Sequence, residues 1–247
     1  MEKENKFPSE VIELPSKGLL YPEDSPLSSG TVEMKYMTAK EEDILTNQNY
    51  ITQGVVIDKL LQALIVDKSI DYNQMLIGDK NALLIAARVL GYGKEYTFNY
   101  AGEEVEVDLS QVSNKSVDES LFVKGKNEFT FTTPSTGDEI VFKLLTHGDE
   151  QKIQKEISGI QKFNREASPE LSTRLKYMIL AVNDNADTKA IREFVDNRLL
   201  ARDSRAFRNY LAEFQPDVDL KFYPENGPTG GVDIPIGVNF LWPDANL

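Results

Sequence analysis

The sequence of 247 residues contains no cysteine and a single histidine, His147. Without thiols, the chain forms no disulfide bond and no zinc site of the cysteine type. A histidine-based catalytic dyad would have to combine His147 with a serine or a carboxylate. The local sequence Thr146-His147-Gly148 lies between a predicted strand and a predicted helix, which favours a polar turn residue over a general base.

Other sequence motifs of binding sites are missing or incomplete. No segment matches the Walker phosphate loop, and the glycine-rich residues 227–231 lack the lysine and the following helix that would hold a phosphate. The oxygen-rich residues 183–187 offer too few ligands for a calcium loop and fit a polar turn between helices. We therefore expect no catalytic residue, no cofactor, no metal site and no enzymatic activity.

Basic residues are in deficit, with 27 lysines and arginines against 40 aspartates and glutamates and a formal net charge of −13. This charge argues against duplex nucleic acid or an anionic membrane as the main partner, because both are polyanions. No apolar run approaches the ~20 residues that span a bilayer. The charged first ten residues lack the apolar core of a secretory signal, and we expect residues 1–10 to be disordered until a partner orders them.

Residues 11–47 contain three successive patterns. Residues 14–22 (LPSKGLLYP) include two prolines and a glycine, which exclude a regular helix, yet three consecutive residues are apolar. Residues 31–37 alternate between apolar and polar side chains, which is typical of a half-buried strand. Thr38 and Glu41 then form the capping box of a helix.

Two further helices complete the expected N-terminal domain, residues 11–93. Residues 55–66 carry an apolar stripe at helical spacing. Asp79 is expected to cap a helix over residues 81–90, which is apolar almost all round and therefore belongs in a core. The sequence thus predicts a mostly helical domain with one short strand.

Residues 94–147 change to the alternating period of β-strands. Residues 96–100 and 105–109 predict one β-hairpin, and residues 129–132 and 140–144 predict a second. The two hairpins resemble one another, as YTFNYAGEEVEVDL and FTFTTPSTGDEIVFKL show. Duplication of one unit and independent origin are both compatible with this likeness.

Residues 148–215 return to helical spacing in four amphipathic segments, which predicts a small helical bundle. The second segment starts at Ser168 and Pro169, and its apolar stripe continues to Val182.

Three arginines, Arg198, Arg202 and Arg205, fall on one face if the last two helices of this bundle are nearly continuous. One interpretation is a solvated face that pairs with Asp196 and Asp203. The alternative is docking against an acidic partner surface, because arginine is favoured at interfaces.

Residues 216–247 are rich in proline and glycine but contain large apolar side chains, which disordered tails seldom do. We expect this tail to dock, either on its own domains or on another chain. The predicted fold class is therefore α+β, with a mostly helical N-terminal domain, a central β-hairpin region, a C-terminal helical bundle and an extended docking tail.

The two apolar irregular segments, residues 14–22 and 232–243, are candidate partner-binding surfaces. Tyrosine and tryptophan often anchor interfaces, and extended segments add to the edges of sheets. The alternative is that both segments fold back and complete the core. The candidate residues are Leu14, Pro15, Gly18, Leu19, Leu20, Tyr21 and Pro22 in the first segment, and Ile234, Ile236, Phe240, Trp242 and Pro243 in the second.

The motif LPSKGLLYP, followed by a strand and by MTAKEEDILTN, resembles the start of the baseplate hub assembly family of T4-like contractile-tailed phages. The sequence VDIPIGVNFLWPD resembles the closing segment of that family, an aliphatic run followed by an aromatic residue, tryptophan and proline. The resemblance is best over residues 1–90 and 233–247, and neither motif is catalytic.

The resemblance implies a non-enzymatic viral tail protein that assists assembly of the baseplate hub by binding hub subunits. It implies other phage tail or baseplate hub proteins as partners, with self-association also open, and the host cytoplasm as the location during assembly. A permanent structural subunit of the baseplate hub in the virion is the alternative. A tail-associated hydrolase is a third reading, but no acidic pair stands out for it.

Overall fold

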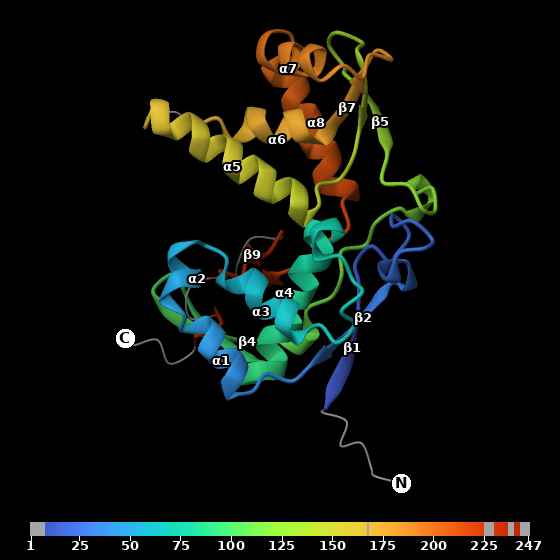
Figure 1. The fold of residues 1–247 in the computed structure, drawn as a ribbon. Helices are drawn as coiled ribbons and strands as arrows, with labels where there is room; N and C mark the ends of the chain where they lie inside the picture. Colours follow the sequence, from blue (N-terminus) through green and yellow to red (C-terminus); the bar gives the residue numbers. More distant parts are fainter. Residues whose placement is uncertain (1–7, 167, 225–229, 237–239, 243–247) are drawn as a thin grey trace.

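The computed structural model describes residues 8–166, 168–224, 230–236 and 240–242, which form a mixed α+β chain with antiparallel strand pairs (Figure 1). Strand β1 (Ser9–Glu13) pairs with β2 (Thr31–Lys35). The expected disorder of residues 1–10 is therefore wrong for Ser9 and Glu10, because both are paired with β2. Residues 1–7 lie outside the described residues.

Short helices follow the β1–β2 pair. They are α1 (Ala39–Leu45), α2 (Gln48–Thr52), α3 (Val56–Leu64) and the 3-10 helix η2 (Tyr72–Gln74), and they precede the longer α4 (Ile77–Tyr92). The predicted capping box at the start of α1 is confirmed, since the Thr38 backbone N–H donates to the Glu41 carboxylate at 3.1 Å.

Helix α4 lies at the centre of the N-terminal elements β1 to α4, as its apolar composition predicts. Leu83 and Ala87 are completely buried. The expected start at residue 81 with Asp79 as the cap is wrong, because α4 begins at Ile77 and Asp79 is a buried residue of its first turn. Gly78 is required there: a Cβ atom at this position would lie 1.9 Å from the carbonyl oxygen of Pro216.

The two predicted hairpins are confirmed as β3 (Glu95–Tyr100) with β4 (Glu103–Asp108) and β5 (Phe129–Thr132) with β6 (Glu139–Phe142). The second hairpin gains a third strand, β7 (Ile179–Val182), which pairs with β6. The prediction that residues 179–182 continue a helix is therefore wrong. Their apolar side chains fit a helical stripe equally well, and pairing with the free edge of β6 decides the conformation.

Helices α5 (His147–Phe163), α6 (Glu170–Met178), α7 (Thr188–Asn197) and α8 (Ala201–Phe214) occupy the segment expected to form a bundle. Helices α6, α7 and α8 pack on the β5–β6–β7 sheet, whereas α5 packs on α6 and η2 (Figure 1). The ring centroid of Phe142 on β6 lies 4.8 Å from that of Phe207 and 5.9 Å from that of Phe214, both on α8. The interior of this half is thus an aromatic layer between a sheet and a helix.

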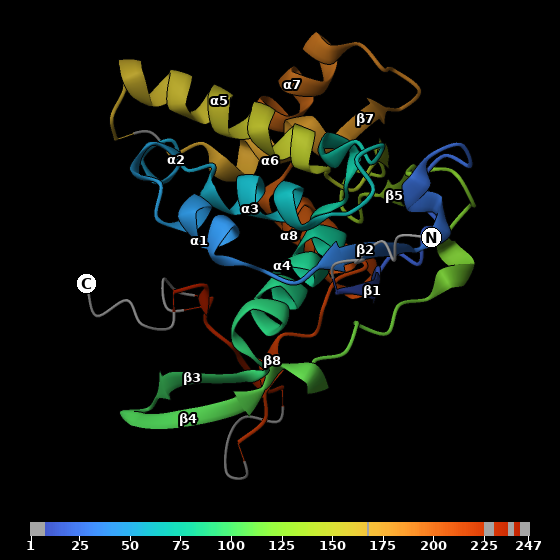
Figure 2. The same ribbon diagram turned by 60° about the horizontal axis from the view of Figure 1, so that its bottom comes forward.

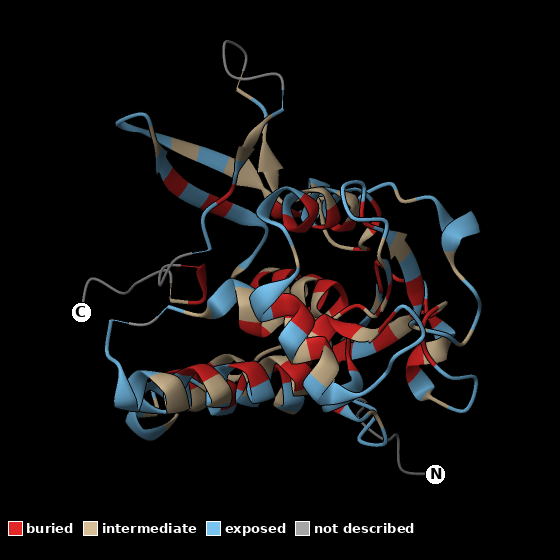
Figure 3. Cartoon of the chain, turned by 90° about the horizontal axis from the view of Figure 1, so that it is seen from above, coloured by how far each residue is buried: buried red, intermediate tan, exposed pale blue. Residues whose placement is uncertain are grey.

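The β3–β4 hairpin projects from the body of the molecule, and the tail runs beside it (Figures 2 and 3). The tail contains two short paired strands, β8 (Lys221–Phe222) and β9 (Val232–Asp233). Buried apolar residues from Leu14 to Leu241 form one contiguous cluster with members in each of the four regions predicted between residues 11 and 247. The division into separate domains stays a prediction.

Candidate partner-binding surface

The LPSKGLLYP turn is fastened to the first turn of α4 by the buried carboxylate of Asp79. Asp79 accepts hydrogen bonds from the Ser16 backbone N–H at 2.9 Å, from the Ser16 hydroxyl at 2.6 Å and from the Tyr21 hydroxyl. The Tyr21 hydroxyl in turn accepts from the Leu76 backbone N–H at 2.9 Å, directly before α4. Burial raises the pKa of Asp79 above its usual range, and these hydrogen bonds oppose that shift.

Gly18 allows the turn to close on itself. Its φ is +75°, and a Cβ atom here would lie 2.5 Å from the backbone nitrogen of Gly30 and from the carbonyl oxygen of Ser28. Both the left-handed conformation and the close backbone approach exclude a larger residue. The serine, the glycine and the tyrosine of the motif thus form the turn and its attachment to α4.

Most candidate residues of the first segment therefore pack within this chain and are not accessible to a partner. Leu14, Pro15, Gly18, Leu20 and Tyr21 are buried, which agrees with the alternative that the segment completes the core. Leu19 is half-buried and Pro22 is exposed. What remains accessible of this segment is small.

The second candidate segment packs against the β3–β4 hairpin and is also largely used within the chain. Tyr96 donates its hydroxyl to the Pro235 carbonyl at 2.7 Å, and its ring meets the buried Phe240 ring edge-on at 5.1 Å. Ile234 is buried, Trp242 is half-buried and Ile236 is 47% exposed. Pro243 lies outside the described residues.

The three candidate arginines do not form a single helical face, because α7 ends at Asn197 and an extended Leu200 precedes α8. Arg198 pairs with Asp138 at 3.5 Å, and Arg202 and Arg205 are exposed on α8. The two expected acidic partners are engaged elsewhere. Asp196 pairs with Lys176 at 2.7 Å, and the completely buried Asp203 accepts from the Ser135 backbone N–H at 2.9 Å.

His147 is the first residue of α5 and is buried among polar side chains of α3, α4 and η2. Its Nε2 atom lies 3.6 Å from the carboxylate of Asp58, which also pairs with Lys80 at 2.6 Å. The Tyr72 ring packs on the imidazole with centroids 4.6 Å apart. Burial lowers the pKa of His147, the Asp58 carboxylate opposes this shift, and Lys80 adds to it. The imidazole joins α5 to the N-terminal helices and is 2% exposed.

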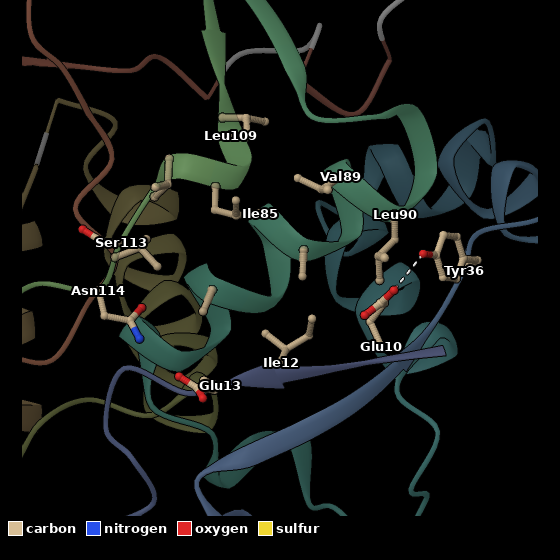
Figure 4. A pocket seen from close by; sticks show the side chains of 14 residues that line it. Glu10, Ile12, Glu13, Tyr36, Ile85, Val89, Leu90, Leu109, Ser113 and Asn114 are labelled. Carbon is tan, nitrogen blue, oxygen red and sulfur yellow. Dashed lines mark hydrogen bonds between the residues drawn. The ribbon is translucent and has the colours of Figure 1, made fainter. Parts of the chain in front are cut away.

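A largely apolar groove of about 610 Å³ lies between β1, α4 and the segment that follows β4 (Figure 4). Its floor is a stripe of α4 side chains at helical spacing, Ala82, Ile85, Ala86 and Val89. Ile12 of β1 faces this stripe (Figure 4). Leu109, Val112, Ser113 and Asn114 line the opposite wall, together with Val218.

The start of the tail holds that opposite wall in place. The backbone N–H of Asp219 donates to the Ser113 carbonyl at 2.7 Å, and the backbone N–H of Lys115 donates to the Asp217 carbonyl at 2.8 Å. Asn81 of α4 donates its side-chain amide to the Asp217 carboxylate at 3.0 Å. The groove is therefore assembled from segments far apart in the sequence.

Two carboxylates stand at the rim of the apolar groove. Glu10 and Glu13 belong to β1 and are exposed, and Glu10 accepts a hydrogen bond from the Tyr36 hydroxyl at 2.9 Å (Figure 4). A groove with an apolar floor and an acidic rim suits a segment with apolar and basic side chains. None of the groove residues was a sequence candidate. The stripe on α4 was visible in the sequence, but a helix that is apolar all round does not reveal which side stays open.

Among the described ranges, no group of three or more histidine, cysteine, aspartate or glutamate side chains is placed to hold a metal ion. Within those ranges, no helix is both long enough and apolar enough to cross a bilayer. In comparisons with known proteins, no family model, no curated protein and no solved structure matches this chain.

Proposed function

We propose that this chain is a non-enzymatic tail protein that assists assembly of the baseplate hub of a contractile-tailed phage by binding hub subunits. The observation that carries the proposal is the resemblance of residues 14–47 and 232–244 to the opening and closing segments of that family. The partners are other tail or hub proteins, and the place of action is the host cytoplasm during assembly.

The surface chemistry supports a role in binding protein rather than nucleic acid. A net charge of −13 disfavours polyanions, and the groove beside β1 offers an apolar floor of the kind that takes up apolar side chains. The excess negative charge of this chain also reduces its non-specific association with other acidic proteins.

The proposal is tested by affinity capture with the full chain from cells infected with the phage that encodes it, beside mass spectrometry of purified mature virions. Capture of hub subunits together with absence from virions is the expected result. Presence in virions at a fixed copy number would instead identify a permanent structural subunit. Capture of no tail or hub protein would contradict the proposal.

A further inference from the structure

Strand β1 presents an edge that forms no backbone pairing with the parts of the chain that the structure describes. Hydrogen bonds from Tyr36 N–H to the Pro8 carbonyl (3.1 Å) and from Leu14 N–H to the Gly30 carbonyl (2.8 Å) continue the β1–β2 register at both ends. Bonded pairs alternate in an antiparallel ladder, so the even-numbered β1 residues bond to β2. The N–H and C=O groups of Ser9, Val11 and Glu13 therefore point to the other edge.

The far edge of β2 is treated differently. Val66 donates its backbone N–H to the Glu33 carbonyl at 2.9 Å, and Met34 forms a bridge with Ile65. This contact blocks the middle of the β2 edge, whereas the β1 edge carries no backbone hydrogen bond from Ser9 to Glu13 among the described residues. A further strand would therefore be added beside β1.

The open edge of β1 borders the apolar groove. Glu10, Ile12 and Glu13 contribute to the groove, whereas no residue of β2 lines it. Figure 4 shows β1 between β2 and the α4 side of the groove. Strands in a sheet lie about 4.8 Å apart, so an added strand would lie over the groove with alternate side chains directed at the α4 stripe. An extended segment bound beside β1 would therefore form backbone hydrogen bonds with the strand and bury its apolar side chains in the groove.

Charge decides between a second copy of this chain and a different protein. Antiparallel pairing of β1 with β1 of another copy, centred on Val11, would make the two Glu10 side chains diagonal neighbours on one face, in two proteins that each carry a net charge of −13. Like charges across a strand pair are destabilising. A segment with lysine or arginine among apolar residues meets the same rim with opposite charge.

We propose that the open edge of β1 and the adjoining groove bind an extended segment of a hub subunit, rich in apolar residues and containing lysine or arginine, as a third antiparallel or parallel strand. This inference depends on the proposed function for the identity of the partner. The groove supplies the side-chain contacts, and Ser9, Val11 and Glu13 supply the backbone hydrogen bonds.

The direct test replaces one backbone donor. Val11→Pro removes the N–H group that faces the open edge and leaves the bonds of Glu10 and Ile12 to β2 intact, because proline is tolerated on strand edges. Its matched control is Val11→Thr, which keeps the donor and the β-branched shape. We expect Val11→Pro to weaken binding of the captured hub subunit by at least roughly tenfold, while Val11→Thr stays within about twofold of the unaltered chain.

A second pair of variants tests the acidic rim without altering the backbone, and it decides the matter if Val11→Pro does not fold. Glu13→Lys reverses a charge in the groove, and Glu103→Lys makes the same change on β4, outside the groove. We expect Glu13→Lys alone to reduce affinity, by roughly three- to tenfold at low salt, with the difference fading at high salt.

Each outcome has a distinct meaning. If the unaltered chain binds a hub subunit and both Val11→Pro and Glu13→Lys bind equally well, the strand-addition site is wrong while the proposed function stands. If the unaltered chain self-associates through this edge and Val11→Pro abolishes that association, the occupant is a second copy and the inference is overturned. If the unaltered chain binds no hub subunit, the proposed function and the inference fall together.

Discussion

The LPSKGLLYP turn and the C-terminal tail share a sequence signature, apolar residues among prolines and glycines, but they are attached to the molecule by different means. The turn is held by hydrogen bonds to the buried Asp79. Beyond Asp219 the tail is held largely by aromatic rings, with Phe240 against Tyr96 and Phe222 against Phe98 and Tyr100. A directional polar anchor fixes one geometry, whereas aromatic packing is tolerant of small shifts.

The two attachments also differ in what depends on them. The turn connects β1 to β2 and contacts the start of α4, so its loss would disturb the centre of the molecule. Beyond Asp219 the tail packs on a projecting hairpin, so loss of this part would act locally (Figure 2). The comparison therefore predicts global effects from variants of the turn and local effects from variants of the tail.

The largest effect is expected from Asp79→Ala. This change leaves the Ser16 N–H and hydroxyl and the Tyr21 hydroxyl without their acceptor in a buried site, which costs about 4 kcal/mol of unfolding free energy. Chemical denaturation followed by circular dichroism measures it. Asp24→Ala, at an exposed position of the same connection, is the control and should change little. Equal stabilities of the two variants would show that the carboxylate is no anchor.

The next effect is expected from Phe240→Ala, which removes a completely buried ring from the tail and costs about 3 kcal/mol where the tail docks. Hydrogen exchange should increase in β8, β9 and the β3–β4 hairpin and stay unchanged in α4. Phe163→Ala is the control, because Phe163 is 96% exposed. Faster exchange throughout α4 would contradict the local character of the tail.

A smaller effect is expected from Asp79→Asn, roughly 2 kcal/mol at neutral pH, because the amide keeps the shape and one acceptor but cannot accept all three hydrogen bonds. Its pH dependence is the sharper readout. Since burial raises the pKa of Asp79, the native state holds that proton to higher pH than the unfolded state does. The stabilisation is complete below the unfolded pKa and is lost as pH rises through the folded pKa.

The unfolding free energy of the unaltered chain minus that of Asp79→Asn should therefore decrease as pH is raised from about 4 toward neutrality. The same subtraction with Phe240→Ala should be flat, because the aromatic contacts carry no charge. Denaturant titrations at several pH values check both. If the difference between the unaltered chain and Asp79→Asn does not change with pH, the Asp79 carboxyl has the same pKa in the folded and unfolded states.

The smallest effect is expected from Phe222→Leu, about 1 kcal/mol, because leucine keeps most of the apolar area and loses the edge-on contacts with Phe98 and Tyr100. Two measurements check this: the thermal unfolding temperature of the variant, and amide hydrogen exchange in the β3–β4 hairpin of the folded protein. A loss as large as that of Phe240→Ala would mean that β8, rather than the end of the tail, carries the attachment.

Local signals in the sequence predicted the local structure well. The capping box of Thr38 and Glu41 and the two hairpins are encoded by neighbouring residues, and the structure confirms them. The apolar spacing of residues 179–182 satisfies both the helical and the strand period, so the sequence predicts a helix there and only pairing with β6 reveals the strand. The sequence predicts Asp79 to be a helix cap because only its local neighbours are visible there. Its actual hydrogen-bond partners, Ser16 and Tyr21, are distant in the sequence.

The candidate surface was harder to predict than the fold. Apolar residues such as Leu14 and Phe240 are equally suited to a core and to an interface, and sequence alone does not decide between them. The groove requires α4, β1 and the segment before Lys115 to meet, and the tail residues Asp217 and Asp219 to hold that segment. An open strand edge is likewise a property of register, which appears only once β1 and β2 are paired.

We infer that the turn and the tail pack within the chain and that the edge of β1 is available to a partner. Amide hydrogen exchange, measured by NMR on the full chain alone and with a captured hub subunit, distinguishes these roles. We expect slower exchange at Val11 and Glu13 on binding, with Ile12 already protected by β2 and Ile234 of the tail unchanged. New protection in the tail, with none at Val11 and Glu13, would overturn this inference.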